Sequence, residues 1–229
     1  MKIAIMQPYL FPYLGYYQLV FHADCFVFLD DVSFIKGGYI ARNHVRGTKS
    51  EPVRFFVGVE KQSQNRSIRD HKFVTDCRKA VASISFCYNK APNFSRVMPL
   101  INDVLFSEDR NVAKLSSKSI EAVFEYLGKE KKFVFASEVG NPCSLRGQER
   151  IIDLCKRLGA TEYANAIGGV GLYEKERFAK EEIRLGFMKM VDSGLELEAR
   201  RYSGFSIIDV LMHCPQDAVL KMLEAYEIV

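Results

Sequence analysis

The stretch MKIAIMQPYLFPYLGYYQLVFHADCFVFLDD (residues 1–31) decides the fold class. Its first apolar run, residues 2–6, predicts a short strand that ends at the prolines following it. Residues 13–22 repeat apolar side chains at helical spacing, and the run CFVFL at residues 25–29 predicts a buried strand. A strand, a helix and a second strand in this order indicate a parallel sheet. We therefore predict a Rossmann-like α/β core.

The rest of the chain extends this pattern. Further strands are predicted over residues 53–59, 132–136, 162–164 and 185–190, and helices over residues 70–83, 93–106, 112–127 and 146–158. Residues 33–44 contain a Gly-Gly pair and indicate a loop, and Ser206 followed by Asp209 indicates the start of a last helix. We expect one α/β domain over residues 1–229, in which the helix-rich stretch 70–127 is a helical lobe or lid.

Composition excludes several classes of protein. Hydrophobic residues make up 48% of the 229 residues and charged residues 26%, which excludes a disordered chain, a collagen and a coiled-coil rod. No apolar run is long enough for a membrane span, and the N-terminus lacks a secretory signal pattern. The six cysteines form no C-x-x-C pair and the four histidines have no metal-ligand spacing, so we expect a cytoplasmic protein without a bound metal. The oligomeric state stays open.

Positive charge is concentrated in one segment. Residues 32–90 carry twelve basic and four acidic residues, a net charge of +8, whereas the segments on either side are each at −2. This segment predicts an anionic partner such as a phosphorylated small molecule, and the alternative is a solvated basic surface. The basic residues are interspersed rather than grouped in a block, which argues against a nucleic-acid-binding arm.

Polar and aromatic residues follow the first two predicted strands. The carboxyl ends of parallel strands meet at one sheet edge, where α/β proteins bind ligands, so we expect the segments after residues 6 and 29 to form one cleft. Its candidate residues are Gln7, Tyr9, Tyr13, Gly15, Asp30, Asp31, Lys36, Tyr39, Arg42 and Asn43. The alternative is structural: the tyrosines, with Phe11 and Tyr17, are core aromatics and the aspartates cap a turn.

These residue types suggest a division of roles. The catalytic candidates are Asp30, Asp31 and Lys36, with either aspartate accepting a proton from an amine or binding sugar hydroxyls. Lys36 and Arg42 are expected to hold a phosphate group. The amides of Gln7 and Asn43 would orient the ligand, and Tyr9, Tyr13 and Tyr39 offer faces for stacking on a base or a sugar. Gly15 would let a ligand approach backbone N–H groups at a helix start.

A longer set of motifs resembles the WbqC-like family. The resemblance rests on Gln7-Pro8, Pro12 to Tyr16, Ala23-Asp24, Phe26 to Val32, Phe34, Lys36, Arg42-Asn43 and Tyr88 to Phe94, which includes Lys90. It covers essentially the whole chain and adds Lys90 to the substrate-binding candidates. Met6 stands where many members have His and Ser33 where many have Gln, so no role for a histidine before Gln7 is transferred.

The resemblance implies a place in bacterial surface-polysaccharide synthesis of the O-antigen type. The substrate would be a nucleotide-linked amino sugar, and the reaction an acyl or aminoacyl transfer to its amine by a transferase or an ATP-dependent amide ligase. ATP with Mg²⁺ is then a possible cofactor. The first alternative is a non-catalytic nucleotide-sugar or glycan-binding scaffold.

A second alternative is a nucleotidylyltransferase, because the order of the first elements is similar to that superfamily. Residues 13–16, Tyr-Leu-Gly-Tyr, stand in the place of its H-x-G-H motif. Tyrosine carries no positive charge to stabilise a phosphate, so this similarity supports the fold more than the reaction.

Overall fold

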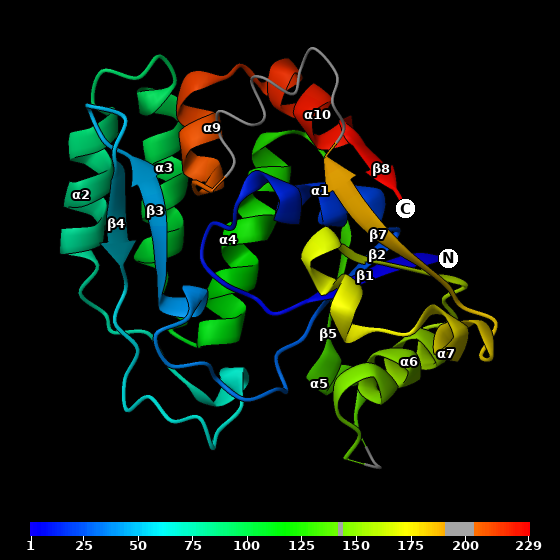
Figure 1. Ribbon diagram of the computed structural model, residues 1–229. Coiled ribbons are helices and arrows are strands. Elements are labelled where there is room, and N and C mark those ends of the chain that lie inside the picture. The colour runs from blue at the N-terminus through cyan, green and yellow to red at the C-terminus, as the bar shows by residue number, and fades with distance from the viewer. Residues whose placement is uncertain (142–143, 191–203) are drawn as a thin grey trace.

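The computed structural model describes residues 1–141, 144–190 and 204–229 (Figure 1). A six-stranded sheet has the order β5-β2-β1-β6-β7-β8, and all neighbours pair in parallel except β7 and β8. Its strands are β1 (Lys2–Met6), β2 (Cys25–Phe28), β5 (Lys132–Phe135), β6 (Glu162–Ala166), β7 (Arg184–Met190) and β8 (Tyr226–Ile228). This confirms the Rossmann-like α/β fold and the pairing of the first two predicted strands. The order of connection reverses between β1 and β6, which is the topological switch point.

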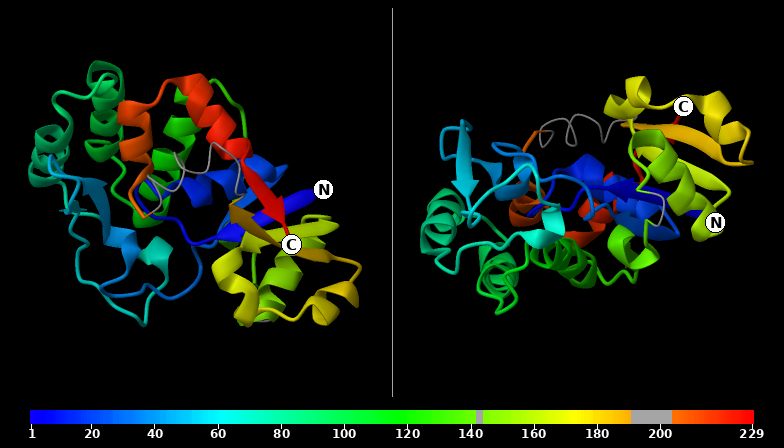
Figure 2. Two further views of the ribbon diagram at one scale, coloured as in Figure 1. Left: turned by 45° about the horizontal axis from the view of Figure 1, so that its top comes forward. Right: turned by 90° about the horizontal axis from the view of Figure 1, so that it is seen from below.

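Helices cover both faces of this sheet. They are α1 (Leu14–His22), α2 (Arg78–Tyr88), α3 (Phe94–Leu105), α4 (Val112–Tyr126), α5 (Ala136–Val139), α6 (Gly147–Arg157), α7 (Lys175–Ala179), α9 (Ile207–His213) and α10 (Gln216–Glu224). Figure 2 shows α6 and α7 on the opposite side of the sheet from α2, α3 and α4. A separate hairpin joins β3 (Arg42–Arg46) to β4 (Pro52–Phe56), and short 3₁₀ turns are η1 (Tyr39–Ala41), η2 (Ile68–Asp70) and η3 (Ile167–Leu172).

The two faces of the sheet follow from alternation along each strand. In β1, Ile3 and Ile5 belong to an apolar cluster with α6 and α7, whereas Ala4 belongs to a cluster on the other face. That second cluster is larger and runs without interruption from α1 and α10 through α4 to α3, α2 and the β3–β4 hairpin. The helix-rich stretch therefore shares its core with the sheet.

Three sequence predictions differ from the structure. Residues 42–46 form β3, which overlaps the expected loop at residues 33–44; the strand was missed because Val45 is its one apolar residue and the buried Asn43 is polar. The helix expected from residue 70 begins at Arg78, because the chain before it is extended: Phe73 bridges Val59, and its N–H donates to the Arg110 carbonyl. The sequence pattern also missed α10 and β8 near the C-terminus. Across the described residues, no helix combines the length and the apolar character that crossing a membrane requires.

A buried acid holds the hairpin against the helices. The Asp209 side chain at the start of α9 is fully buried, and its carboxylate lies 3.0 Å from Arg46 Nε on β3. The Tyr88 hydroxyl at the end of α2 donates to the same carboxylate at 2.8 Å. Asp209 thus joins a strand and two helices that are far apart in the sequence.

Replacing Asp209 by Asn should destabilise the fold strongly. Because the change removes one partner of a buried ion pair, we expect the free energy of unfolding to fall by about 3 kcal/mol. Urea denaturation followed by circular dichroism would measure it. The control is Asp76→Asn, which breaks a solvent-exposed pair with Arg78 and should leave the urea midpoint unchanged. Equal midpoints for both variants would contradict the structural role of Asp209.

Candidate functional site

Two cavities of similar size flank the carboxyl end of β1. The first, here the arginine cavity, has a volume of about 660 Å³. It is lined by Gln7, Leu29, Asp31, Val32, Ser33, Ile35, Asn65, Arg66, Ser67, Asn141, Ser144, Leu145, Arg146, Gly147, Arg150, Ile151 and Tyr173. A volume of this size is typical of small-molecule sites.

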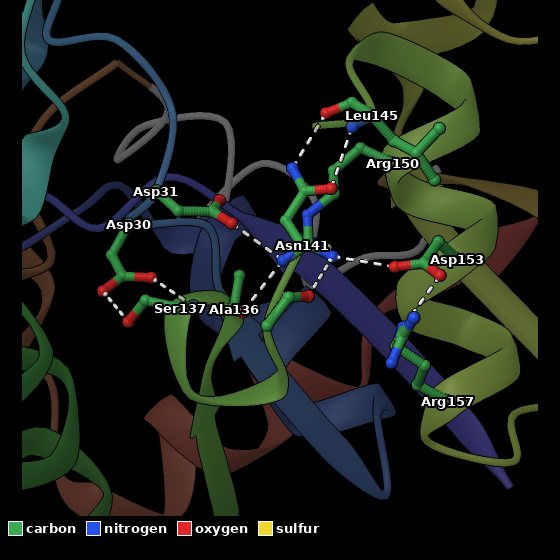
Figure 3. Close-up of polar contacts among 10 residues, drawn as sticks. Asp30, Asp31, Ala136, Ser137, Asn141, Leu145, Arg150, Asp153 and Arg157 are labelled. Carbon is green, nitrogen blue, oxygen red and sulfur yellow. Dashed lines mark hydrogen bonds and ion pairs between the residues drawn. The ribbon is translucent and has the colours of Figure 1, made fainter. Parts of the chain in front are cut away.

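Arg150 lines the arginine cavity, and Figure 3 shows its side chain joined by dashed contacts to Asp31 and Asp153. Its side chain on α6 is 2% exposed. Nη2 donates to the Asp31 carboxylate and the Ala136 carbonyl, each at 2.8 Å. Nη1 donates to the Gly140 carbonyl at 2.8 Å and to the Asp153 carboxylate at 2.9 Å. A buried cation is stable only with such partners, so Arg150 fixes the position of Asp31.

Asp31 presents one carboxylate oxygen that the described residues leave without a partner. Oδ2 accepts from Arg150, while Oδ1 is buried and has no hydrogen bond. Among the described lining residues of the arginine cavity, Asp31 is the one acid. An acceptor of this kind suits an amine or hydroxyl donor of a ligand.

Cationic groups lie at the rim of the same cavity. The Arg66 side chain donates to the backbone carbonyls of Lys61 and Asp70, and no carboxylate of the described residues forms an ion pair with it. Arg146 is exposed, and its side chain has no acidic partner within the described ranges. It precedes α6, whose N-terminus has no side-chain cap and begins at Gly147 with φ +53°, a conformation that favours glycine. Two guanidinium groups and free helix N–H groups together favour an anion.

Asp30 is used inside the fold. It is 3% exposed and accepts from the Ser137 N–H at 2.9 Å and from the Ser137 hydroxyl at 2.7 Å, which fixes the start of α5. Burial raises the pKa of the Asp30 carboxyl above its ordinary value, against the opposing effect of the two hydrogen bonds from Ser137. Asp30 does not line either cavity.

The second cavity, here the tyrosine cavity, lies at the switch point on the α1 side. Its volume is about 640 Å³, and its described lining is Tyr9, Tyr13, Leu14, Gly15, Gln18, Tyr39, Asn43, Ala166, Ile167, Gly168, Met188, Lys189, Met190 and Gly204. Five of the predicted site residues thus meet here. Gly15 has a different role from the expected one: a Cβ at this position would lie 2.6 Å from the Tyr13 ring, so glycine makes room for that ring.

The loop between β1 and α1 is held by hydrogen bonds to Phe11. This residue is buried with φ +44°, a left-handed conformation that is strained for phenylalanine. Its carbonyl accepts from Asn43 Nδ2 and from the Ser206 hydroxyl, both at 2.7 Å, and its N–H donates to Ser119 Oγ at 3.0 Å. Asn43 therefore positions the loop instead of presenting its amide donor to a ligand.

The remaining predicted residues lie elsewhere. Arg42 lines a third, smaller cavity beside the arginine cavity, and neither Lys36 nor Lys90 lines any of these three cavities. The predicted single cleft is thus divided, with Gln7 and Asp31 in the arginine cavity and the tyrosines in the other. Within the described residues, no three His, Cys, Asp or Glu side chains group to hold a metal ion.

Sequence reasoning missed the contribution of α6. Arg146 and Arg150 come from a segment that is distant in sequence from the two N-terminal loops. One signal was available: Arg150 stands four residues before Leu154, on the apolar stripe of the predicted helix. A charged residue on such a stripe indicates a buried partner.

Comparison with known proteins gives the following matches. A family model described as the WbqC-like protein family matches residues 7–221. An uncharacterized protein of Mycobacterium tuberculosis is 24% identical over 228 residues, which cover 95% of each chain. No solved structure matches the chain significantly.

The raised pKa of Asp30 predicts a specific pH dependence. A carboxyl group whose pKa is higher in the folded chain than in the unfolded chain binds its proton more tightly when folded, so lowering the pH favours folding. As the pH falls from 7 towards the unfolded value of about 3.9, wild type should gain stability relative to Asp30→Asn. Urea unfolding of both proteins at several pH values would show it. If the difference in unfolding free energy between the two proteins stayed constant with pH, or if wild type lost stability relative to the variant as the pH fell, the raised pKa would be contradicted.

Proposed function

The chain belongs to the WbqC-like protein family, and we propose that it is an enzyme acylating a nucleotide-linked amino sugar. The resemblance noted above associates this family with bacterial surface polysaccharides, and the enzyme would act in the cytoplasm, where nucleotide sugars are made. The reaction would transfer an acyl or aminoacyl group to the sugar amine.

One observation carries the proposal: two cavities of different chemistry lie at one sheet edge. The arginine cavity combines guanidinium groups with one carboxylate, whereas the tyrosine cavity combines aromatic rings with methionines. Gln7 of the first and Tyr9 of the second are two residues apart on the same loop. A transferase needs separate places for a charged acceptor and a less polar donor whose reacting ends meet, and this pair of cavities offers them.

The acceptor fits the arginine cavity. Its diphosphate would lie against Arg66, Arg146 and the N-terminus of α6, where anions are stabilised. Tyr173 offers a ring for stacking on the base or sugar. The sugar amine would then lie near Gln7 and the partnerless Oδ1 of Asp31.

The chemistry requires a base and an activated acyl group. The neutral amine nitrogen attacks the acyl carbonyl carbon, a C–N bond forms, and the bond to the leaving group breaks. Asp31 Oδ1 accepts the proton that the nitrogen loses and passes it to the leaving group, a thiolate or an adenylate phosphate. The activated donor is either an acyl thioester or an acyl adenylate made from a carboxylic acid and ATP. In the second case Mg²⁺ would accompany the nucleotide phosphates.

The second candidate function is a non-catalytic binding protein. It is favoured because both aspartates already form hydrogen bonds within the protein. Asp30 accepts from Ser137 and Asp31 from Arg150, which leaves few groups for proton transfer. The nucleotidylyltransferase alternative finds no such support. Tyr16, which stands at a signature histidine, is fully buried and donates to the Gln7 carbonyl at 3.1 Å.

Substitutions at the rim should weaken binding of the acceptor. With UDP-glucosamine as the probe, Arg146→Gln and Arg66→Gln should each raise the Kd about tenfold, because each removes one charge-assisted contact. Isothermal titration calorimetry would measure it. The control is Lys90→Gln, in the same charge class but away from the cavities, which should leave the Kd unchanged. If all three variants changed the Kd equally, the diphosphate would not bind at Arg66 and Arg146.

Asp31→Asn should abolish turnover while leaving acceptor binding nearly intact. Wild type would be incubated with UDP-glucosamine and either an acyl-CoA or a carboxylic acid with ATP and Mg²⁺, and the amide product detected by mass spectrometry. We expect kcat to fall at least a hundredfold in Asp31→Asn, because it loses the base. The control Asp153→Asn removes the other carboxylate partner of Arg150 without touching the arginine cavity. Binding of UDP-glucosamine without product from any donor would favour the non-catalytic candidate.

A further inference from the structure

A third cavity lies on the β3–β4 hairpin, next to the arginine cavity. It has a volume of about 290 Å³ and shares Ile35 with the arginine cavity. Its polar lining consists of Arg42, Arg54 and Gln62, and Gly37 and Gly38 form one wall. The size suits a small group such as a phosphate.

The strand register brings the two arginines to the same face of the hairpin. Arg42 pairs with Phe56, and Arg54 pairs with His44. Arg42 and Arg54 are therefore diagonal neighbours, and such Cβ atoms lie about 7–8 Å apart. The opposite face, with Asn43, Val45 and Phe55, is buried in the core, so both guanidinium groups are on the side of the cavity.

Neither guanidinium group is neutralised. Within the ranges that the structure describes, no carboxylate lies within ion-pair distance of Arg42 or Arg54, and neither side chain has a hydrogen bond to protein. The Nε of Arg42 is also buried without a partner. Buried N–H donors are nearly always hydrogen-bonded to protein, water or a ligand, and the described residues supply no acceptor to this one. Two like charges over one cavity repel each other unless an anion lies between them.

We infer that this third cavity is a second anion-binding site, which takes a phosphate group of a small molecule. The Arg42 and Arg54 guanidinium groups would bind the anion from two strands, with Gln62 donating from the side. This inference does not depend on the proposed acyl transfer. The phosphate can come from two sources: a further group of the molecule in the arginine cavity, or a separate phosphorylated molecule.

The test uses inorganic pyrophosphate in a background that disables the arginine cavity. The full-length Arg66→Gln/Arg146→Gln protein should still bind pyrophosphate in calorimetry at low ionic strength. Adding Arg42→Gln or Arg54→Gln should raise the Kd at least tenfold. The matched control is Arg69→Gln, an exposed arginine of the same basic segment that lines none of the three cavities. Loss of binding in the background protein itself, or equal effects of Arg54→Gln and Arg69→Gln, would overturn the inference.

Both arginine variants should fold as the wild type does, so a loss of pyrophosphate binding would not come from unfolding. Arg54 is exposed, and Arg42 has no protein partner that its loss would leave unpaired, so both variants should melt at the wild-type temperature. A second titration distinguishes the sources. If Arg54→Gln in otherwise wild-type protein also raises the Kd of UDP-glucosamine, the third cavity binds a group of that molecule. If Arg54→Gln raises the Kd of pyrophosphate but leaves the Kd of UDP-glucosamine unchanged, the site takes a separate phosphorylated molecule.

Discussion

The Arg150 guanidinium must be neutralised inside the protein, and the candidate site depends on this constraint. With 2% of its side chain exposed, it relies on two carboxylates and two carbonyls for partners. Those partners come from the end of β2, from α5 and the chain after it, and from α6. Asp31, which lines the arginine cavity, is consequently fixed in position, and so is the N-terminal part of α6. The same contact thus sets the positions of both Asp31 and the start of α6 at the arginine cavity.

The basic segment finds its explanation in this arrangement. Arg66 of that segment lines the arginine cavity, and Arg42 and Arg54 line the third cavity, so three of its twelve basic residues gather at neighbouring concave surfaces. Positive potential concentrated over neighbouring concave surfaces attracts anionic small molecules more effectively than the same charge spread over the protein. The tyrosine cavity adds a less polar surface at the same sheet edge.

Sequence alone predicted the sheet and placed the candidate residues in one cleft, whereas the structure distributes them over separate cavities. Apolar runs and their spacing located β1, β2 and α1, because burial on a parallel sheet demands those patterns. The pattern also led correctly to the sheet edge where Gln7 and Asp31 lie. It could not separate the loop residues, because the direction of each side chain depends on distant partners: Asn43 turns to the Phe11 backbone, and Asp30 turns to Ser137. Nor could it bring α6 to the site, since that requires the register of strands more than a hundred residues apart.

The strained conformation of Phe11 has a consequence for the time at which the protein becomes competent during synthesis. The residues that hold its backbone, Asn43, Ser119 and Ser206, are spread over most of the chain, and the last follows it by 195 positions. A left-handed phenylalanine costs about 1–2 kcal/mol, so the loop is not held in this shape before its three hydrogen-bond partners are present. While the ribosome still holds the C-terminal helices, β1 and β2 can exist but the loop between the two cavities cannot be set. The loop between the two cavities therefore reaches its final shape only when most of the chain is present.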